Sequence, residues 1–314
     1  MINTDTKRKL VILTGPTGVG KTALSILLAQ KINAEIISAD SMQVYKYMDI
    51  GSAKIQPFEM MEIPHHLIDI LNPLDNFDVV TFQRLAKEAM ESIYNKGKIP
   101  LIVGGTGFYI QSVLYDIDFT EEKTGVYREE LENIAKIKGA DYLYDMLLKV
   151  DPESTKVIHK NNIRKVIRAL EYYHDTGEKI SAHNEQERLR ESRYDFNYFV
   201  LNMPRERLFE NIDIRVDKMV EEGLLEEVLR LQEMGCKRGI SSMQGLGYKE
   251  ILDYLDGEYD FSEAVRIIKR DTRHFAKRQL TWFKRERDVT WLNKEEFDYD
   301  NDRILEYMIG EINK

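Results

Sequence analysis

The segment Gly15-Pro16-Thr17-Gly18-Val19-Gly20-Lys21-Thr22 is a complete G-x-x-x-x-G-K-[ST] phosphate-binding loop. An apolar run from Leu10 to Leu13 precedes it, and a helix-like stretch from Ala23 to Ile32 follows it. The glycines permit a tight turn in which successive backbone N–H groups converge on phosphate oxygens. In such a loop, the lysine neutralises the terminal phosphate and the Thr22 hydroxyl holds Mg²⁺. The loop therefore predicts a phosphate or diphosphate ligand with Mg²⁺ as cofactor, but it does not specify the reaction.

The composition is that of a globular protein. Of its 314 residues, 43% are hydrophobic and 32% are charged. The length is enough for one large domain and a second, smaller one. No segment approaches the roughly 18 to 20 unbroken apolar residues of a membrane-spanning helix. The single cysteine, Cys236, excludes an internal disulfide and a cysteine-based zinc site. We expect a cytoplasmic monomer with no membrane contact.

Apolar and β-branched runs alternate with helical periodicity along most of the chain. The predicted strands are Leu10–Thr14, Glu35–Ala39, His66–Ile70, Ile99–Val103, Tyr198–Leu201 and Val289–Leu292. Strands that alternate with helices after a phosphate loop indicate an α/β fold, here a P-loop NTPase-like core with a mainly parallel sheet flanked by helices.

One part of the chain departs from this alternation. From Asp118 to Arg193 the sequence is charged and helical in period, with stops at Gly125, Gly139, Pro152 and Gly177. We expect residues 1–117 and 195–314 to form the catalytic core, and residues 118–194 to form an inserted all-helical domain. After the insertion, an amphipathic stretch from Arg205 to Met234 is broken at Gly223.

Charge is distributed unevenly. The net charge is −9, yet the window from Arg266 to Arg287 holds nine lysines and arginines against two acidic residues. At helical spacing most of these cations fall within one arc, opposite Ile268 and Phe283, and Gln279 lands on the apolar side, where its amide needs a partner. A solvated amphipathic helix is the ordinary alternative, but such a helix normally mixes glutamate with lysine. We therefore favour a helix that faces a polyanion.

Two further segments follow predicted strands. Asp40-Ser41-Met42-Gln43 comes after the second strand, and Gly104-Gly105-Thr106-Gly107 comes after the fourth. The ends of parallel strands meet at one edge of a sheet, so we expect both beside the phosphate loop. The ordinary alternatives are a helix N-cap at Asp40 and a plain tight turn at the glycines.

Three other sets of residues have open interpretations. Arg215 has two interpretations. It is either an exposed arginine, paired with Asn211 or beside Asp217, or its guanidinium clamps a leaving phosphate. Arg164 and Arg168 lie away from a predicted buried stripe made by Ile163, Val166, Ile167 and Leu170, and face either solvent or a phosphodiester. The adjacent pair His65 and His66 is more often structural than metal-binding.

Taken in order, the motifs resemble those of tRNA dimethylallyltransferases, the bacterial tRNA isopentenyltransferases. The segments that carry the resemblance are Gly15–Thr22, Asp40–Tyr45, Met48–Lys54, His66–Asp69, Gly104–Gly107, Arg168–Glu171, Gly245–Glu250 and Lys277–Phe283. The resemblance runs from the phosphate loop to about Lys284, and the set as a whole is highly specific.

The resemblance implies transfer of a dimethylallyl group from dimethylallyl diphosphate to N6 of adenosine 37 in tRNA, beside the anticodon. The loop then holds a diphosphate leaving group, which accounts for the absence of a standard ATPase second motif. Asp40 is implied as the base that removes the N6 proton, Thr106 as a group near the reacting centre and Arg215 as a clamp on the diphosphate.

The resemblance also implies that the adenosine leaves its stack to enter the pocket. The tRNA-contacting residues that it implies are Asp40, Ser41, Met42, Gln43, Thr106, Arg128, Arg164, Lys165, Arg168, Gly247, Lys277, Arg278 and Gln279. Lys165 stands where family members commonly have arginine, so the positive charge is kept.

Three alternatives stay open at this stage. An adenylate dimethylallyltransferase uses the same chemistry on AMP or ATP, but needs neither a helical insertion nor a basic helix. A small-molecule P-loop kinase predicts ATP turnover, with the insertion as its lid. A non-catalytic RNA-binding protein would use a nucleotide as a switch.

Overall fold

The computed structural model describes residues 7–119 and 126–314. Within these ranges the strands form one sheet in the order β3-β2-β4-β1-β5-β6, and every neighbouring pair is parallel. The strands are β1 (Arg8–Thr14), β2 (Ala34–Ala39), β3 (His65–His66), β4 (Ile99–Gly104), β5 (Tyr194–Asn202) and β6 (Val289–Asn293). The predicted α/β fold with a parallel sheet is confirmed.

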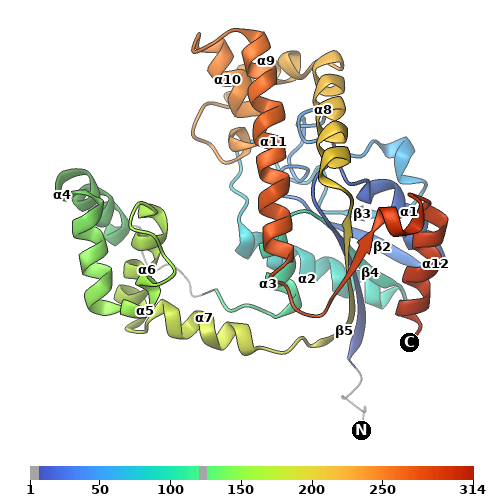
Figure 1. The fold of residues 1–314 in the computed structure, drawn as a ribbon, viewed down its shortest axis with the longest axis horizontal. Helices are drawn as coiled ribbons and strands as arrows, with labels where there is room; N and C mark the ends of the chain where they lie inside the picture. Colours follow the sequence, from blue (N-terminus) through green and yellow to red (C-terminus); the bar gives the residue numbers. More distant parts are fainter. Residues whose placement is uncertain (1–6, 120–125) are drawn as a thin grey trace. The chain divides into compact units, whose positions relative to one another are not determined.

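The central strands are apolar on both faces because helices cover both. Val11 and Leu13 pack in a core with α1 (Lys21–Lys31) and α12 (Asn301–Ile312), whereas Leu10 and Ile12 point to the opposite face. Figure 1 shows α1 and α12 on one side of the sheet, with α2 (Val79–Asn95) and α3 (Gly107–Leu114) on the other. This double cover explains why the strands read as continuous apolar runs.

The chain after β5 supplies the remaining helices of this unit. They are α8 (Arg205–Glu221), α9 (Leu224–Glu233), α10 (Tyr248–Leu255) and α11 (Phe261–Phe283). Gly223 separates α8 from α9 with a φ of 99°, as predicted. The long helix α11 packs along α8, and the two run side by side in Figure 1.

The third predicted strand, His66–Ile70, is wrong in its extent. Only His65 and His66 pair with β2. Leu67 and Asp69 have φ values of 63° and 55°, which a strand does not allow, so the chain turns away from the sheet.

Residues 115–192 form a separate compact unit. Its helices are α4 (Val126–Val150, kinked at Gly139), α5 (Pro152–Thr155), α6 (Ile163–Thr176) and α7 (Ile180–Leu189). The predicted stops at Gly139, Pro152 and Gly177 are confirmed, and Gly177 takes the left-handed conformation that ends α6. The predicted stop at Gly125 lies outside the described residues. The stripe of α6 is buried at Val166, Ile167 and Leu170, but Ile163 at its first turn is exposed, so its predicted burial is wrong.

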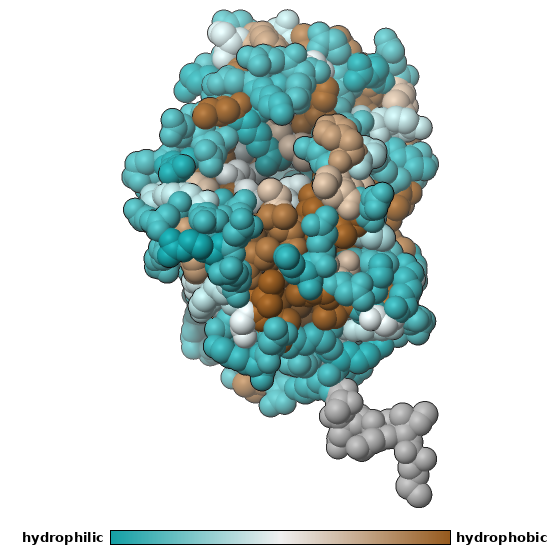
Figure 2. Space-filling model, turned by 90° about the vertical axis from the view of Figure 1, so that its right-hand side faces the viewer, coloured by the Kyte–Doolittle hydropathy of each residue, from teal (hydrophilic) through white to brown (hydrophobic). Residues whose placement is uncertain are grey.

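Hydrophilic residues cover most of the molecular face in Figure 2, which also has a hydrophobic area near its middle. Across residues 7–119 and 126–314, no helix is both long enough and apolar enough to cross a bilayer.

Candidate active site

A cavity of about 660 Å³ lies in the unit that contains the sheet. Its lining includes the loop after β1, the Asp40–Gln43 segment after β2 and the Gly104–Thr106 turn after β4. These strands are neighbours in the order β2-β4-β1, so their carboxyl ends bring the three segments to one place. The predicted convergence at one sheet edge is confirmed.

The phosphate loop carries a lysine, Lys21, whose pKa is lowered by its surroundings. Lys21 Nζ donates hydrogen bonds of 2.9 Å to the carbonyl oxygens of Gly15 and Pro16. Burial, together with the positive charge of Arg215, lowers the pKa of Lys21 to about 7, although Asp40 opposes this shift. An anion placed on this loop would oppose the shift and raise the pKa of Lys21, because it supplies the counter-charge that the buried ammonium lacks.

Arg215 reaches the same loop from α8. Its Nη1 lies 3.3 Å from Thr17 Oγ1, and its side chain lines the cavity. The alternative pairing with Asp217 or Asn211 is wrong, because Asp217 pairs with Lys269 at 2.6 Å and Asn211 donates to the Gly18 carbonyl at 3.2 Å. The Lys21 ammonium and the Arg215 guanidinium therefore both lie at the phosphate loop.

One carboxylate oxygen of Asp40 accepts backbone hydrogen bonds, and the other is available to a substrate. Its Oδ1 accepts hydrogen bonds from the backbone N–H groups of Met42 (2.8 Å) and Gln43 (3.3 Å). A turn follows rather than a helix, so the carboxylate caps a turn and not the helix N-terminus. Within the described ranges, Oδ2 has no hydrogen-bond partner. One oxygen therefore fixes the side chain, and the other can accept a proton.

The neighbours of Asp40 and Thr106 also face the cavity. Ser41, Met42, Gln43 and Thr106 all line it. The Gln43 amide nitrogen lies 3.4 Å from the Ser52 carbonyl oxygen and 3.3 Å from that of Ala53. It therefore ties the Asp40 segment to the Met48–Lys54 segment, whose Gly51, Ser52 and Ala53 also line the cavity.

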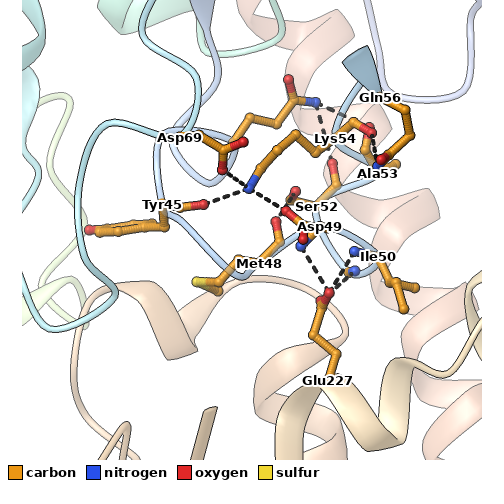
Figure 3. Close-up of polar contacts among 12 residues, drawn as sticks. Tyr45, Met48, Asp49, Ile50, Ser52, Ala53, Lys54, Gln56, Asp69 and Glu227 are labelled. Atoms are coloured by element: carbon orange, nitrogen blue, oxygen red, sulfur yellow. Dashed lines mark hydrogen bonds and ion pairs between the residues drawn. The ribbon is translucent and has the colours of Figure 1, made fainter. Parts of the chain in front are cut away.

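A buried carboxylate, Glu227 of α9, organises the Met48–Lys54 segment (Figure 3). It accepts backbone hydrogen bonds from Asp49 (2.9 Å), Ile50 (2.8 Å) and Gly51 (3.0 Å). It also accepts one from the Tyr248 hydroxyl (2.8 Å). Three successive N–H groups directed at one anion form a nest. Sequence reasoning missed Glu227, since nothing local distinguishes it from the exposed glutamates beside it.

The other end of the segment is fixed by Lys54 (Figure 3). Its buried Nζ lies 2.7 Å from the Tyr45 carbonyl oxygen, 2.6 Å from Asp49 Oδ1 and 2.5 Å from Asp69 Oδ1. Three oxygens satisfy the three donors of the ammonium group. Asp69, which follows the short strand, is therefore committed to this lysine.

We expect Glu227→Gln to lower the free energy of unfolding by about 1–3 kcal/mol, because an amide leaves part of this buried backbone nest without an acceptor. Urea denaturation measures the change. Glu226→Gln is the matched control, since Glu226 is the neighbouring residue and is exposed. Equal stability of the two variants would contradict the anchoring role.

Several cations of the basic helix, α11, pair with acidic side chains, which the sequence alone does not indicate. Arg273 pairs with Asp213 of α8 at 2.5 Å, Lys269 pairs with Asp217, and Arg266 and Arg270 pair with acids of their own helix. The prediction that the whole arc faces a polyanion therefore needs correction, because α8 supplies acidic partners that a count along one helix omits. Lys277, Arg278, Lys284 and Arg285 are exposed, and across the described ranges no acidic side chain pairs with them.

Gln279 is buried at 6% exposure, on the apolar side of α11 as predicted. Its amide finds the partners that burial requires, because Oε1 accepts from the Thr17 N–H (2.9 Å) and Nε2 donates to the Gly105 carbonyl (3.0 Å). Its predicted tRNA contact stays a prediction. Gly247 is also buried, and its N–H donates to Glu250 at 2.8 Å.

Four of the residues with predicted tRNA contacts belong to the helical unit. Arg128 lies 2.6 Å from the buried Glu171, and Arg168 lies 3.9 Å from the same carboxylate. Arg164 and Lys165, at the start of α6, are exposed. Within this unit, Glu171 therefore fixes two of the cations, while the other two project from the helix.

The histidine pair has structural contacts. His66 lies 2.9 Å from Glu35, which also binds Lys96 and Lys98. His65 Nδ1 lies 2.8 Å from the Ile63 carbonyl oxygen, and burial lowers its pKa. No group of three or more His, Cys, Asp or Glu side chains in residues 7–119 and 126–314 is placed to hold a metal ion.

The parallel sheet, the loop after β1 and the cavity at the strand ends define an α/β protein of the P-loop class. The family model described as IPP transferase matches residues 43–286, and the one described as isopentenyl transferase matches residues 8–70. The chain therefore belongs to the IPP transferase family.

Individual relatives agree with this assignment. The chain is 60% identical over 298 residues to a tRNA dimethylallyltransferase of Lachnoclostridium phytofermentans, and the alignment covers 95% of each chain. It resembles the solved structure of a tRNA isopentenylpyrophosphate transferase from Bacillus halodurans with a TM-score of 0.74 and 43% identity, over 98% of this chain and 97% of that one. A eukaryotic dimethylallyltransferase acting on tRNA gives a TM-score of 0.79 at 32% identity, over 91% and 74% of the two chains.

Proposed function

We propose that this enzyme transfers the dimethylallyl group of dimethylallyl diphosphate to N6 of adenosine 37 in tRNA, next to the anticodon, and releases diphosphate. It is a tRNA-modifying prenyltransferase by family, and the named position on the tRNA is the finer part of the proposal. The observation that carries the proposal is the cavity itself, which brings the phosphate loop and the Asp40 carboxylate together.

The donor half of the cavity suits a leaving diphosphate. As the allylic C1–O bond breaks, negative charge builds on the diphosphate, and preorganised donors stabilise that charge. The backbone N–H groups of Gly18 to Thr22, the Lys21 ammonium and the Arg215 guanidinium are these donors. The contact of Arg215 with Thr17 Oγ1 supports its role as a clamp on the loop's ligand.

The acceptor half suits an adenine amine. The N6 lone pair is delocalised into the ring, so the amine becomes nucleophilic only as its proton leaves. In the proposed step the N6–C1 bond forms, the C1–O bond breaks and the N6 proton passes to Oδ2 of Asp40. Thr106, whose backbone N–H donates to the carbonyl of Ala39 next to Asp40 (3.3 Å), lines the cavity and is placed to hydrogen-bond the acceptor.

The residues present fit a magnesium ion. Mg²⁺ prefers oxygen ligands and commonly binds through one or two protein oxygens together with substrate phosphates. Thr22 is exposed to the cavity at the start of α1, and its hydroxyl would hold the ion beside the diphosphate. When bound, Mg²⁺ neutralises charge on the leaving group.

For the tRNA, the proposal assigns Ser41, Met42 and Gln43 to the extruded nucleotide. Backbone phosphates are assigned to exposed cations of α11 and to four cations of the helical unit, the exposed Arg164 and Lys165 and the half-buried Arg128 and Arg168. The proposal treats the enzyme as a monomer. We place it in the cytoplasm, where an unmodified tRNA meets a prenyl donor.

We expect Lys277→Gln combined with Arg278→Gln to weaken tRNA binding and to reduce the slope of log K against log salt by about 1.5, because two phosphate contacts are lost. Filter binding across a salt series measures this slope. The pair Arg84→Gln and Arg303→Gln removes the same charge from helices outside the cavity and should leave the slope unchanged. An unchanged slope in the α11 variant would mean that this helix faces away from the RNA.

Labelled dimethylallyl diphosphate tests the reaction against its alternatives. The protein is incubated with the donor and either unmodified tRNA, AMP, or ATP with small acceptors, with and without Mg²⁺. We expect label in tRNA only, at one adenosine beside the anticodon, and only with Mg²⁺. Label on AMP would indicate an adenylate dimethylallyltransferase, and ATP consumption without label transfer would indicate a kinase.

A further inference from the structure

Two glycine-containing motifs of the cavity are joined by one side chain from a third segment. Gln279, on α11, is hydrogen-bonded at both ends of its amide, to the Thr17 N–H in the phosphate loop and to the Gly105 carbonyl in the turn after β4. A glutamine amide has one acceptor and one donor group, and this geometry uses each of them. Leucine or methionine would match neither partner, and glutamate would match only the first.

The turn after β4 is shaped to receive this face of α11. A Cβ on Gly105 would lie 2.1 Å from Gln279 Nε2, and a Cβ on Gly107 would lie 2.2 Å from the Trp282 ring. Gln279 and Trp282 are three residues apart and therefore share one helix face. Glycine stands at both positions because the helix approaches the turn too closely for any side chain.

Both partners of Gln279 adjoin reacting groups. Thr17 belongs to the loop that receives the diphosphate, and its hydroxyl contacts Arg215. Gly105 immediately precedes Thr106, which lines the acceptor side. We propose that Gln279 is a positioning residue that sets the distance between the diphosphate loop and the acceptor-side turn. The proposal rests on the proposed function and adds a residue that acts through its neighbours rather than on the substrates.

The same contact connects RNA binding to the donor site. Lys277 and Arg278 precede Gln279 on α11 and are exposed, whereas Gln279 is buried against both loops. Gln279 thus couples the helix assigned to the RNA with the spacing of the two loops.

The test compares Gln279→Leu and Gln279→Glu with the wild type and with Thr281→Ala, an exposed control on the same helix. Single-turnover transfer is measured with saturating tRNA and donor, together with tRNA affinity, melting temperature and a pH profile. We expect Gln279→Leu to slow transfer roughly 10- to 100-fold at every pH, since small misplacements of reacting groups cost this much, with tRNA affinity close to wild type.

Gln279→Glu separates positioning from a purely structural role. Its ionised carboxylate faces the Gly105 carbonyl oxygen without a proton to donate, whereas its protonated form restores the donor. We therefore expect its rate, relative to wild type, to rise as the pH falls, and Thr281→Ala to show no such trend. A lower melting temperature with a wild-type rate per folded molecule, or a flat relative pH profile, would overturn the proposal. The proposed function fails separately, because it is refuted by a wild-type protein that puts no label into tRNA, whatever the Gln279 variants do.

Discussion

Asp40→Asn is expected to lower the rate of prenyl transfer by roughly 10²- to 10⁴-fold, the contribution of a positioned general base. The substitution is nearly isosteric, and an asparagine oxygen can still accept the N–H groups of Met42 and Gln43 that hold the turn. What it removes is the basic oxygen that lacks a partner. Single-turnover measurement with saturating substrates isolates this step, and tRNA affinity should stay close to wild type.

Asp78→Asn is the matched control for Asp40. Asp78 also caps backbone, accepting the Thr81 N–H at 2.8 Å at the start of α2, and it is exposed outside the cavity. The control should transfer at the wild-type rate. If Asp40→Asn also retained near wild-type activity, Asp40 would not be the base.

Lys21→Met should cost roughly 10²- to 10³-fold in transfer rate, because it removes the ammonium that meets the charge developing on the diphosphate. Methionine keeps an unbranched chain of similar length, and it also removes the hydrogen bonds from Nζ to the Gly15 and Pro16 carbonyl oxygens. Affinity for an unreactive prenyl thiodiphosphate, measured by calorimetry, gives the binding part of the loss. Wild-type affinity in this variant would place the diphosphate away from Lys21.

The pH dependence of that affinity provides a second test of Lys21. Its pKa is about 7, and a bound diphosphate raises it by supplying counter-charge. Because the pKa of Lys21 is higher in the complex, the contribution of Lys21 to the affinity is largest below pH 7. It declines as the pH rises from 7 towards the pKa of Lys21 in the complex. The ligand's own titration is common to wild type and Lys21→Met, so the difference between their profiles isolates the lysine. Parallel profiles would contradict the assignment.

Much of the fold and the core of the site could be predicted from sequence because the signals are local. The phosphate loop lies between a strand and a helix, and the carboxyl ends of parallel strands lie together, so the neighbourhood of Gly15–Thr22, Asp40 and Thr106 follows from topology. The need of the Gln279 amide for hydrogen-bond partners could also be predicted, since helical spacing places it among apolar residues. Its two partners, 174 and 262 residues away in sequence, could not.

The failures have a shared physical cause, which is contact between segments far apart in the chain. The basic arc of α11 reads as unpaired until α8 brings Asp213 and Asp217 against it. The strand β3 is short because the chain after it turns towards Lys54, whose ammonium forms an ion pair with Asp69. Glu227 anchors a segment more than 170 residues earlier, and no periodicity marks it.

A crystal structure with an unreactive thiodiphosphate analogue of the prenyl donor tests the central claim most directly. We expect the diphosphate on the N–H groups of Gly18 to Thr22, within hydrogen-bonding distance of Lys21 and Arg215, and the allyl carbon directed towards the side of the cavity that holds Asp40. A diphosphate bound elsewhere, with the loop making no contact to it, would contradict the account.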